Sequence, residues 1–155
     1  MKAFATTLLL AVLSFVPEAR AADLCPLVAQ LNQALVEGTR YRAVPCPEIG
    51  FVALDNQPGL RSQAGAYFPE TGQIELAPDL DLTTAYRQSF LLHEMVHAAQ
   101  FAEGADSRVP CIAALEAEAY LVQAQFLHDA GLTRDALFTR MLGEQLGTCG
   151  AQPDY

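Results

Sequence analysis

The feature that most constrains the fold is a short polar sequence inside an apolar segment. His93, Glu94 and His97 lie within an otherwise apolar run at positions 90–99. Residues four apart stack on one face of an α-helix, so both imidazoles face the same side with the carboxylate beside them. Burying three polar groups among apolar side chains is costly unless they share a partner. The chain must therefore build a helix whose polar groups meet one common partner.

The residues from His93 to His97 have the pattern HExxH, which suits a zinc ion. Two imidazoles on one helical face can bind one Zn²⁺ while Glu94 reaches a metal-bound water. Zinc lowers the pKa of that water to about 7 and polarises a substrate carbonyl, and a glutamate can remove the proton and pass it to the leaving amine. We therefore predict His93 and His97 as ligands of Zn²⁺ and Glu94 as the general base.

A catalytic zinc site also needs a third protein ligand and one open position. Glu116 and Glu118 follow in a later predicted helix. At about 100° per residue, Glu116 lies about 60° from the centre of the apolar face of that helix and Glu118 about 100° from it. We predict Glu116 as the third ligand, with Glu118 as the alternative. His128, beside Asp129 at the far end of the helix, is expected to be solvated.

The arrangement resembles the gluzincins, HExxH zinc metallopeptidases (zincins) that include small single-domain members. Those proteins carry a glutamate ligand on a helix after the motif, often in an ExxxD or ExxA context. The segment Glu116–Tyr120 is similar, with Tyr120 where several families have Asp, so the resemblance does not supply the group that orients the histidines. It covers two helices and implies a minimal zincin-like domain with a peptide or protein substrate. A metzincin is disfavoured, because Gln100 stands at its glycine position and Glu103 at its ligand position.

Supporting roles have several candidates. Tyr67, Tyr86 and Tyr120 are candidates for stabilising the oxyanion that develops on the attacked carbonyl, and each is otherwise an ordinary packed aromatic. The segment 72–77 resembles the zincin edge strand that pairs with an extended substrate. Backbone hydrogen bonds of that strand would then hold the peptide.

The first 21 residues have the layout of a secretory signal. Lys2 precedes an apolar run at 3–16, and Ala19-Arg20-Ala21 offers the small-x-small pattern that signal peptidase reads. We predict cleavage after Ala21 and a secreted or periplasmic protein. The apolar run is shorter than the roughly 20 residues that span a bilayer, so no stable membrane anchor is expected.

The remaining residues, 22–155, have the length of a single domain. The whole chain contains 18 acidic and 9 basic residues, and removal of Lys2, Glu18 and Arg20 would make the balance more acidic still. Such a surface repels nucleic acid and anionic lipid, so neither is expected as a partner.

Four cysteines lie in the predicted mature part, and none belongs to a CxxC pair. An even number in a small exported domain predicts two disulfides. The predicted helices on either side of Gly131 should form an antiparallel hairpin, which brings the start of one near the end of the other. This geometry pairs Cys111 with Cys149 and leaves Cys25 with Cys46.

The pattern of apolar residues predicts an α+β fold. Apolar spacing and stop signals predict helices from Leu24 to about Gly38, from Asp81 or Thr83 to about Phe101, from Pro110 to about Gly131, and from Thr133 to about Leu146. Apolar runs at 51–54, 66–68 and 74–76 predict a small antiparallel sheet, with a hairpin turn at 69–72. We therefore expect an N-terminal helix, a sheet, the motif helix and a C-terminal helical pair.

Two other functions are compatible with these features. An exported zinc-binding or interaction domain would keep the metal as a structural staple with little turnover, and a fourth protein ligand or a blocked cleft would favour it. A disulfide-stabilised binding module would hold no zinc. Zinc-dependent hydrolysis of peptide bonds is the function that the sequence favours.

Overall fold

The computed structural model describes residues 24–54 and 64–150, so the predicted signal at 1–21 and cleavage after Ala21 lie outside the described residues. The described part is an α+β fold with four α-helices and a three-stranded sheet. In chain order the elements are α1 (Cys25–Gly38), β1 (Ile49–Phe51), β2 (Gly65–Phe68), β3 (Gln73–Leu76), α2 (Ala85–Ala102), a short 3₁₀ helix (Asp106–Arg108), α3 (Ala113–Asp129) and α4 (Thr133–Leu146).

The sheet is mixed, so the prediction of a wholly antiparallel sheet is wrong. Its strand order is β1-β3-β2. The strands β2 and β3 form the predicted antiparallel hairpin, and Gly72 in the turn has a φ of 73°. The strand β1 lies parallel to β3, with Ile49 beside Ile74, and begins two residues before the predicted 51–54. A long connection separates β1 from β2, and such a connection allows a parallel partner that a tight turn forbids.

This strand order also corrects the prediction for the segment 72–77. It forms β3, the central strand, whose backbone is hydrogen-bonded on both sides. The edge strand beside α2 is β2 instead. Tyr67 lies opposite Ile74, whose N–H donates to the Glu48 carbonyl on the β1 side, so the backbone of Tyr67 faces away from β3.

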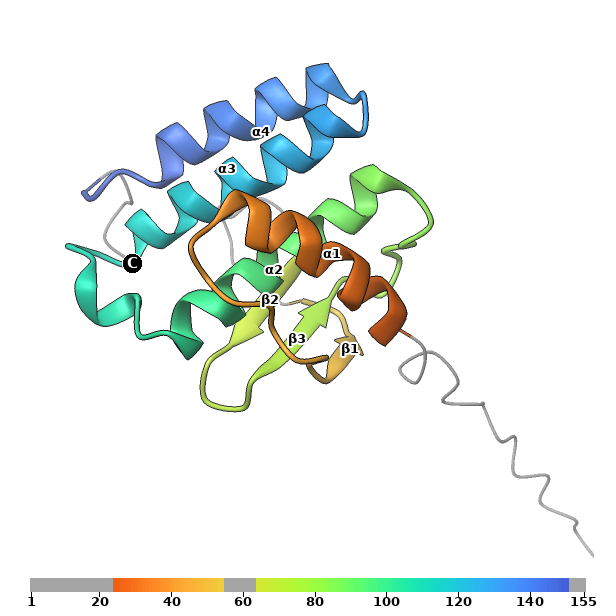
Figure 1. Ribbon diagram of the computed structural model, residues 1–155, viewed down its shortest axis with the longest axis horizontal. Coiled ribbons are helices and arrows are strands. Elements are labelled where there is room, and N and C mark those ends of the chain that lie inside the picture. The colour runs from red at the N-terminus through yellow and green to blue at the C-terminus, as the bar shows by residue number, and fades with distance from the viewer. Residues whose placement is uncertain (1–23, 55–63, 151–155) are drawn as a thin grey trace, which may run out of the picture.

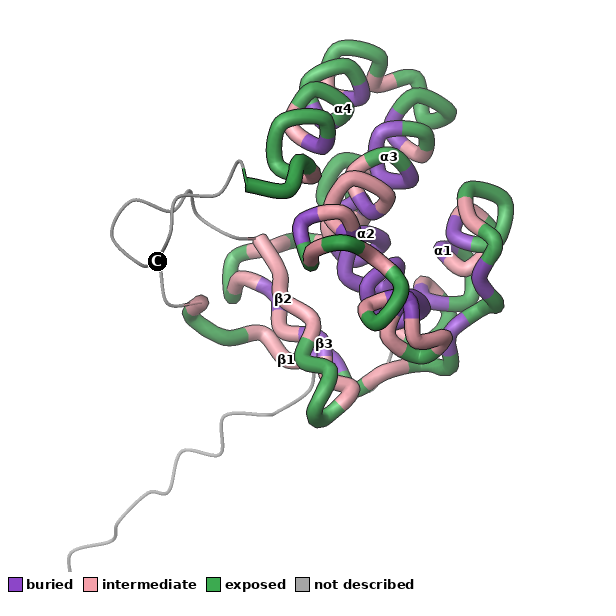
Figure 2. The backbone as a smooth tube through the Cα atoms, turned by 90° about the vertical axis from the view of Figure 1, so that its left-hand side faces the viewer, coloured by how far each residue is buried: buried purple, intermediate pink, exposed green. Residues whose placement is uncertain are grey.

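Helix α2 is the centre of the fold. Thr84 caps its N-terminus by accepting a hydrogen bond from the Arg87 N–H, whereas the predicted cap Asp81 accepts from the backbone N–H and the hydroxyl of Thr83 one turn earlier. All residues at 91–100 are buried, as expected of a helix covered on all sides. Figure 1 shows the sheet on one side of α2 and the α3–α4 pair on the other, and Figure 2 shows the buried residues concentrated along α2. The apolar face of α1 completes the core with Val28, Leu31 and Leu35.

Helices α3 and α4 form the predicted antiparallel hairpin (Figure 1). Gly131 makes the turn with a φ of 80°. The predicted start of α3 at Pro110 is wrong, because Pro110 and Cys111 lie in the turn before it and α3 begins at Ala113. Helix α4 begins at Thr133 as predicted, but its N-cap is Leu132 and no side chain caps it. The hairpin packs closely, since a Cβ added at Gly143 would lie 2.6 Å from the Cβ of Tyr120.

The two predicted disulfides are confirmed. Cys25 is bonded to Cys46 and Cys111 to Cys149. The second bond ties the start of α3 to the end of α4, as the hairpin geometry predicts. Two disulfides indicate an oxidising compartment. None of the helices in 24–54 and 64–150 combines the length and the apolar character that crossing a bilayer requires.

Candidate metal centre

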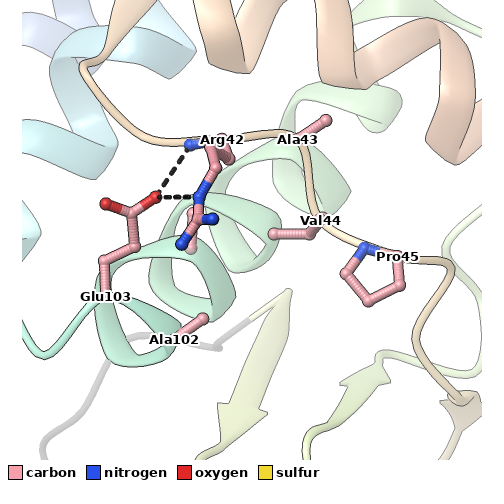
Figure 3. Close-up of a pocket in the computed structure, with 7 residues that line it drawn as sticks. Arg42, Ala43, Val44, Pro45, Ala102 and Glu103 are labelled. Atoms are coloured by element: carbon pink, nitrogen blue, oxygen red, sulfur yellow. Dashed lines mark hydrogen bonds and ion pairs between the residues drawn. The ribbon is translucent and has the colours of Figure 1, made fainter.

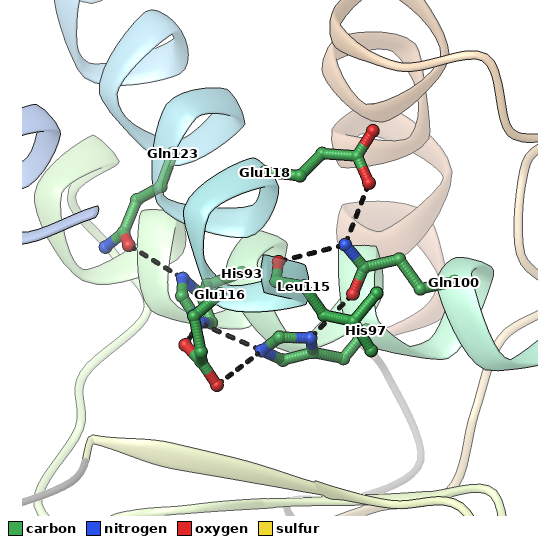
Figure 4. Close-up of polar contacts among 7 residues, drawn as sticks. All are labelled: His93, His97, Gln100, Leu115, Glu116, Glu118 and Gln123. Carbon is green, nitrogen blue, oxygen red and sulfur yellow. Dashed lines mark hydrogen bonds and ion pairs between the residues drawn. The ribbon is translucent and has the colours of Figure 1, made fainter. Parts of the chain in front are cut away.

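Two histidines of α2 and one glutamate of α3 bring their donor atoms to one point. His93 Nε2 lies 3.1 Å from His97 Nε2. The Glu116 carboxylate places Oε2 at 3.2 Å from His93 Nε2 and Oε1 at 3.3 Å from His97 Nε2. Figure 4 shows both rings and the carboxylate turned toward one another. In the described part of the chain, they are the one group of three or more His, Cys, Asp or Glu side chains that can hold a metal ion.

The packing of α3 against α2 explains how these side chains meet. His93 and His97 lie one turn apart on the face of α2 that α3 covers, and Glu116 lies in the first turn of α3 between the buried Leu115 and the half-buried Ala117. The side chains of His93 and His97 are 9% and 11% exposed, whereas that of Glu116 is 31% exposed. Solvent therefore reaches the group from the side of Glu116.

The alternative ligand Glu118 lies elsewhere. Its Oε2 accepts hydrogen bonds from the Tyr41 hydroxyl at 2.8 Å and from the Gln100 Nε2 at 2.9 Å. Glu118 is half-buried, so it is not the solvated side chain that helix periodicity suggests. The two glutamates thus have separate roles: Glu116 meets the histidines, and Glu118 holds a neighbouring glutamine.

The charges of His97 and Glu116 stabilise one another. Burial disfavours the charged form of His97, but the hydrogen bond and negative charge of Glu116 raise the pKa of this imidazole to about 9. Burial likewise opposes the carboxylate of Glu116, and its hydrogen bonds to His93 and His97 lower its pKa below the usual range. An ion that binds here must therefore displace a firmly held proton.

Glu94 is buried beside this group and contacts the sheet. Burial raises the pKa of its carboxyl, while the positive charges of His93 and His97 and the backbone N–H of Tyr67 oppose the rise. Gly65 of β2 allows the close approach, since a Cβ there would lie 2.9 Å from the Glu94 Cγ and 3.0 Å from Leu76. The edge strand β2 therefore borders the glutamate that the sequence predicts as the base.

Two buried glutamines contact the histidines, a role that the sequence pattern does not predict. Gln123 Oε1 lies 3.1 Å from His93 Nδ1, and Gln100 Oε1 lies 2.8 Å from His97 Nδ1 (Figure 4). The available signal was a polar residue inside an apolar stretch. Gln100 directly follows the run at 90–99, Gln123 stands between Val122 and Ala124 on α3, and both glutamines are buried.

The three candidate tyrosines have different positions. Tyr120 packs its ring against His93, with ring centroids 4.5 Å apart, and burial raises its pKa to about 12, with Glu116 and Glu94 adding to the rise. Tyr67 packs its ring against Phe101. Tyr86 is 44% exposed and packs against Phe90. Tyr120 is therefore the tyrosine whose ring contacts a predicted ligand.

The other residues considered as ligands lie away from the group. His128 is exposed near the end of α3. Glu103 follows the last turn of α2 and accepts hydrogen bonds from the backbone N–H and the side-chain Nε of Arg42, at 3.0 and 3.3 Å. Figure 3 shows this pair at the rim of a hollow formed by the segment 42–45 and the end of α2. Neither residue belongs to the metal-binding group.

Comparison with known proteins assigns a family to the chain. The model of the family described as "Domain of unknown function (DUF6647)" matches residues 21–152. The chain belongs to this family. No curated protein and no solved structure matches it.

In this member of the DUF6647 family, the donor set fits a divalent ion such as zinc. Two imidazoles and a carboxylate are ligands that Zn²⁺ accepts, and three protein ligands with one open position is the composition of catalytic zinc sites. Ligand atoms bound at about 2.0–2.1 Å in a tetrahedron lie about 3.3–3.4 Å apart. The two Nε2 atoms lie 3.1 Å apart, close to this spacing, and one donor atom from each of the three residues lies within 4.8 Å of the others. The group can therefore hold a metal ion.

Proposed function

We propose that the protein is an exported zinc metallopeptidase of the gluzincin type. In this proposal, His93, His97 and Glu116 bind Zn²⁺, and the protein hydrolyses peptide bonds. Glu94 is the general base that removes a proton from the attacking water. The observation that carries the proposal is the meeting of two His Nε2 atoms 3.1 Å apart with the Glu116 carboxylate, which lies within 3.3 Å of both, and the buried Glu94 is on the same helix as the two histidines. The zincin-like architecture belongs to the same proposal.

The ligand set favours a catalytic ion over a structural one. Structural zinc sites are closed by four protein ligands, whereas catalytic sites keep one position open. Within the described residues, no fourth His, Cys, Asp or Glu side chain joins His93, His97 and Glu116, and the cysteines there are consumed in disulfides. The partial exposure of Glu116 leaves a side on which a substrate can approach.

The protein groups have distinct tasks in this mechanism. A bound zinc ion would polarise the substrate carbonyl and make a water acidic enough to lose its proton. Glu94 takes up that proton and delivers it to the leaving amine. Burial raises the pKa of the Glu94 carboxyl above that of a solvated glutamate, and this favours the uptake of the proton that it later delivers. The N–H of Tyr67 orients the carboxylate.

The edge strand β2 suits an extended peptide. In the described sheet, β2 has one neighbour, β3, and its other side borders Glu94. A peptide that paired with this side would gain backbone hydrogen bonds and would lie beside the base. This assigns to β2 the role that the sequence suggested for 72–77. Tyr120 is the tyrosine best placed to stabilise an oxyanion, because it contacts His93.

The test is zinc content and peptide cleavage measured on the same oxidised samples. Wild type should hold one zinc per chain and cleave a peptide library. Glu94→Gln should keep the metal and lose cleavage, because the base is not a ligand. Glu116→Ala should bind zinc weakly and should not cleave. Glu144→Gln, on the exposed face of α4, is the matched control and should behave as wild type.

Each alternative has its own outcome in this experiment. Stoichiometric zinc without cleavage by wild type, over a library of varied composition, would support the structural-metal domain. No zinc after demetallation and refilling would overturn the metal site itself and support a binding module. Loss of zinc in Glu94→Gln would show that the ligand assignment is wrong.

A further inference from the structure

We propose that Gln100 and Gln123 are positioning residues of the metal site. Their side-chain amide oxygens accept the Nδ1–H of His97 and His93, and this fixes both imidazoles in the tautomer whose Nε2 lone pair points at the ion. The inference rests on the metal-binding part of the proposed function. It supplies the orienting groups that the resemblance to gluzincins leaves unassigned.

The direction of the Gln100 amide follows from its partners. Its Nε2 lies 3.0 Å from the Leu115 carbonyl oxygen and 2.9 Å from a carboxylate oxygen of Glu118. Both partners are acceptors, so this end of the amide must be the NH₂ group. The oxygen at the other end then faces His97 Nδ1 at 2.8 Å, and that nitrogen must carry the proton.

The orientation of the Gln123 amide follows from the hydrogen bonds of the Ser89 hydroxyl. The Ser89 hydroxyl donates to the Tyr86 carbonyl oxygen at 2.7 Å, so Ser89 Oγ is an acceptor toward Gln123 Nε2 at 3.0 Å. The amide oxygen of Gln123 therefore faces His93 Nδ1 at 3.1 Å. His93 must also carry its proton on Nδ1.

These directions bring three acceptors to one point. With Nδ1 protonated, the Nε2 atom of each neutral ring has a lone pair and no hydrogen. Two such nitrogens and a carboxylate lie within 3.3 Å of one another, an arrangement that a cation stabilises. The two glutamines thus fix the tautomer in which each Nε2 atom is free to bind a metal ion. Because both side chains are neutral amides, they add no charge to the site.

Gln100 and Gln123, here called the glutamine clamps, differ in whether a glutamate can replace them. This difference makes the inference testable. In Gln123→Glu, the atom that replaces Nε2 faces a hydroxyl, which can turn and donate to it. In Gln100→Glu, the corresponding atom faces the Leu115 carbonyl and the Glu118 carboxylate, and three acceptors would then lie together. A carboxylate is therefore an acceptable clamp for His93 and a poor one for His97.

The experiment measures zinc affinity by competition with a chelator, using the oxidised chain. Gln100→Met and Gln123→Met keep the side-chain length but remove the acceptor, and each should weaken zinc binding by about 10–100-fold. Gln123→Glu should bind at least as tightly as wild type, whereas Gln100→Glu should lose affinity like its Met variant. Gln145→Glu makes the same charge change on the exposed face of α4 and should leave affinity within about twofold of wild type.

Nitrogen-15 NMR of the imidazoles provides a readout that a merely structural role would not change. In the zinc-loaded protein both rings should show protonated Nδ1 with slowly exchanging protons, and the Met variant should speed exchange at its own histidine alone. If position 100 does not tolerate Met, the Met and Glu variants of Gln123 carry the test.

Two results would overturn the inference: folded Met variants that bind zinc as tightly as wild type, or rings protonated on Nε2. Should wild type bind no zinc, the tautomers can still be read in metal-free protein at a pH where NMR shows both imidazoles to be neutral. Failure of the metal site and failure of the clamps are therefore distinguishable.

Discussion

The two sides of α3 are built in opposite ways. Toward α2, the helix presents Glu116, Glu118 and Gln123, which form hydrogen bonds to other polar groups, among the apolar core residues Leu115, Ala119 and Val122. Toward α4, the Cβ of Tyr120 faces Gly143, and Ala117 faces Gly147. The Cys111–Cys149 disulfide lies at the end of the hairpin. One side combines apolar core residues with polar groups that are costly to bury, and the other consists of close packing and a covalent bond.

This difference shows how a small domain can sustain a buried polar site. Hydrogen bonds between neutral groups, such as that of Gln123 to Ser89, fix direction but add little net stability, because they replace contacts with water. Close packing and a disulfide stabilise the fold without regard to the polar groups. The α4 side and the apolar core residues together hold α3 in place, and the polar groups facing α2 use that placement to align the donor atoms.

The largest expected effect comes from removing the covalent tie on the α4 side. Cys111→Ser with Cys149→Ser should destabilise the fold by about 4 kcal/mol, since the bond closes a loop with a sequence separation of 38. Removing Cys25–Cys46, with a separation of 21, should cost about 3 kcal/mol. Urea unfolding of both pairs checks the order, and a larger loss at Cys25–Cys46 would contradict this account.

The next effect comes from the close packing between α3 and α4. Gly143→Ala should destabilise the fold by about 1–3 kcal/mol, because the added Cβ would lie 2.6 Å from the Tyr120 Cβ. Thermal unfolding measures the loss, and Gln145→Ala on the exposed face of the same helix is the control. A Gly143→Ala protein as stable as this control would show that the space between α3 and α4 can accommodate a methyl group at this position.

The polar groups between α2 and α3 should make the stability of the fold depend on pH. The pKa of His97 is raised to about 9 in the metal-free fold, so the stability it contributes is complete below pH 6.5 and is lost as the pH rises through 9. The slope should not exceed about 1.4 kcal/mol per pH unit for one proton. We expect the Tm of metal-free protein to fall in this window. The fall should be absent in His97→Gln and in the zinc-loaded protein; a flat metal-free profile would refute the His97–Glu116 pairing.

The smallest effect is expected at the outer end of the polar network. Tyr41→Phe removes the hydroxyl that donates to Glu118 at 2.8 Å and should cost about 1 kcal/mol. Zinc affinity should fall less than in Gln100→Met, because Glu118 keeps its bond to Gln100. Tyr86→Phe, at an exposed position, is the control, and equal losses in the two variants would show that the Tyr41 hydroxyl adds nothing specific.

Local patterns in the sequence predicted much of the fold. Helix spacing, the turn at 69–72 and the Gly131 hairpin are short-range features, and the structure has them with end shifts of a few residues. The pairing of Cys111 with Cys149 followed from the hairpin alone. The choice of Glu116 over Glu118 as the residue nearest the histidines also followed from helix geometry, since the two side chains leave the helix in different directions.

Contacts between residues far apart in the chain could not be predicted from the sequence. The parallel pairing of β1 with β3 depends on how a connecting segment crosses the sheet, and no local pattern encodes that path. The glutamine clamps depend on which buried amides meet across two helices. Gly65 is a further example, because its need for a missing Cβ arises from Glu94 of a different element.

The hydrogen bond between Tyr41 and Glu118 joins residues 77 apart in the chain, and Glu116 follows His93 by 23. A nascent chain that ends after α2 thus has two imidazoles but neither the third donor nor the anchor of Gln100. Such contacts must offset the entropy of closing a long loop before they stabilise the fold. The group that could hold a metal ion is therefore complete only when α3 has packed on α2, and in the proposed function the ion would be bound after that step rather than by a shorter nascent chain.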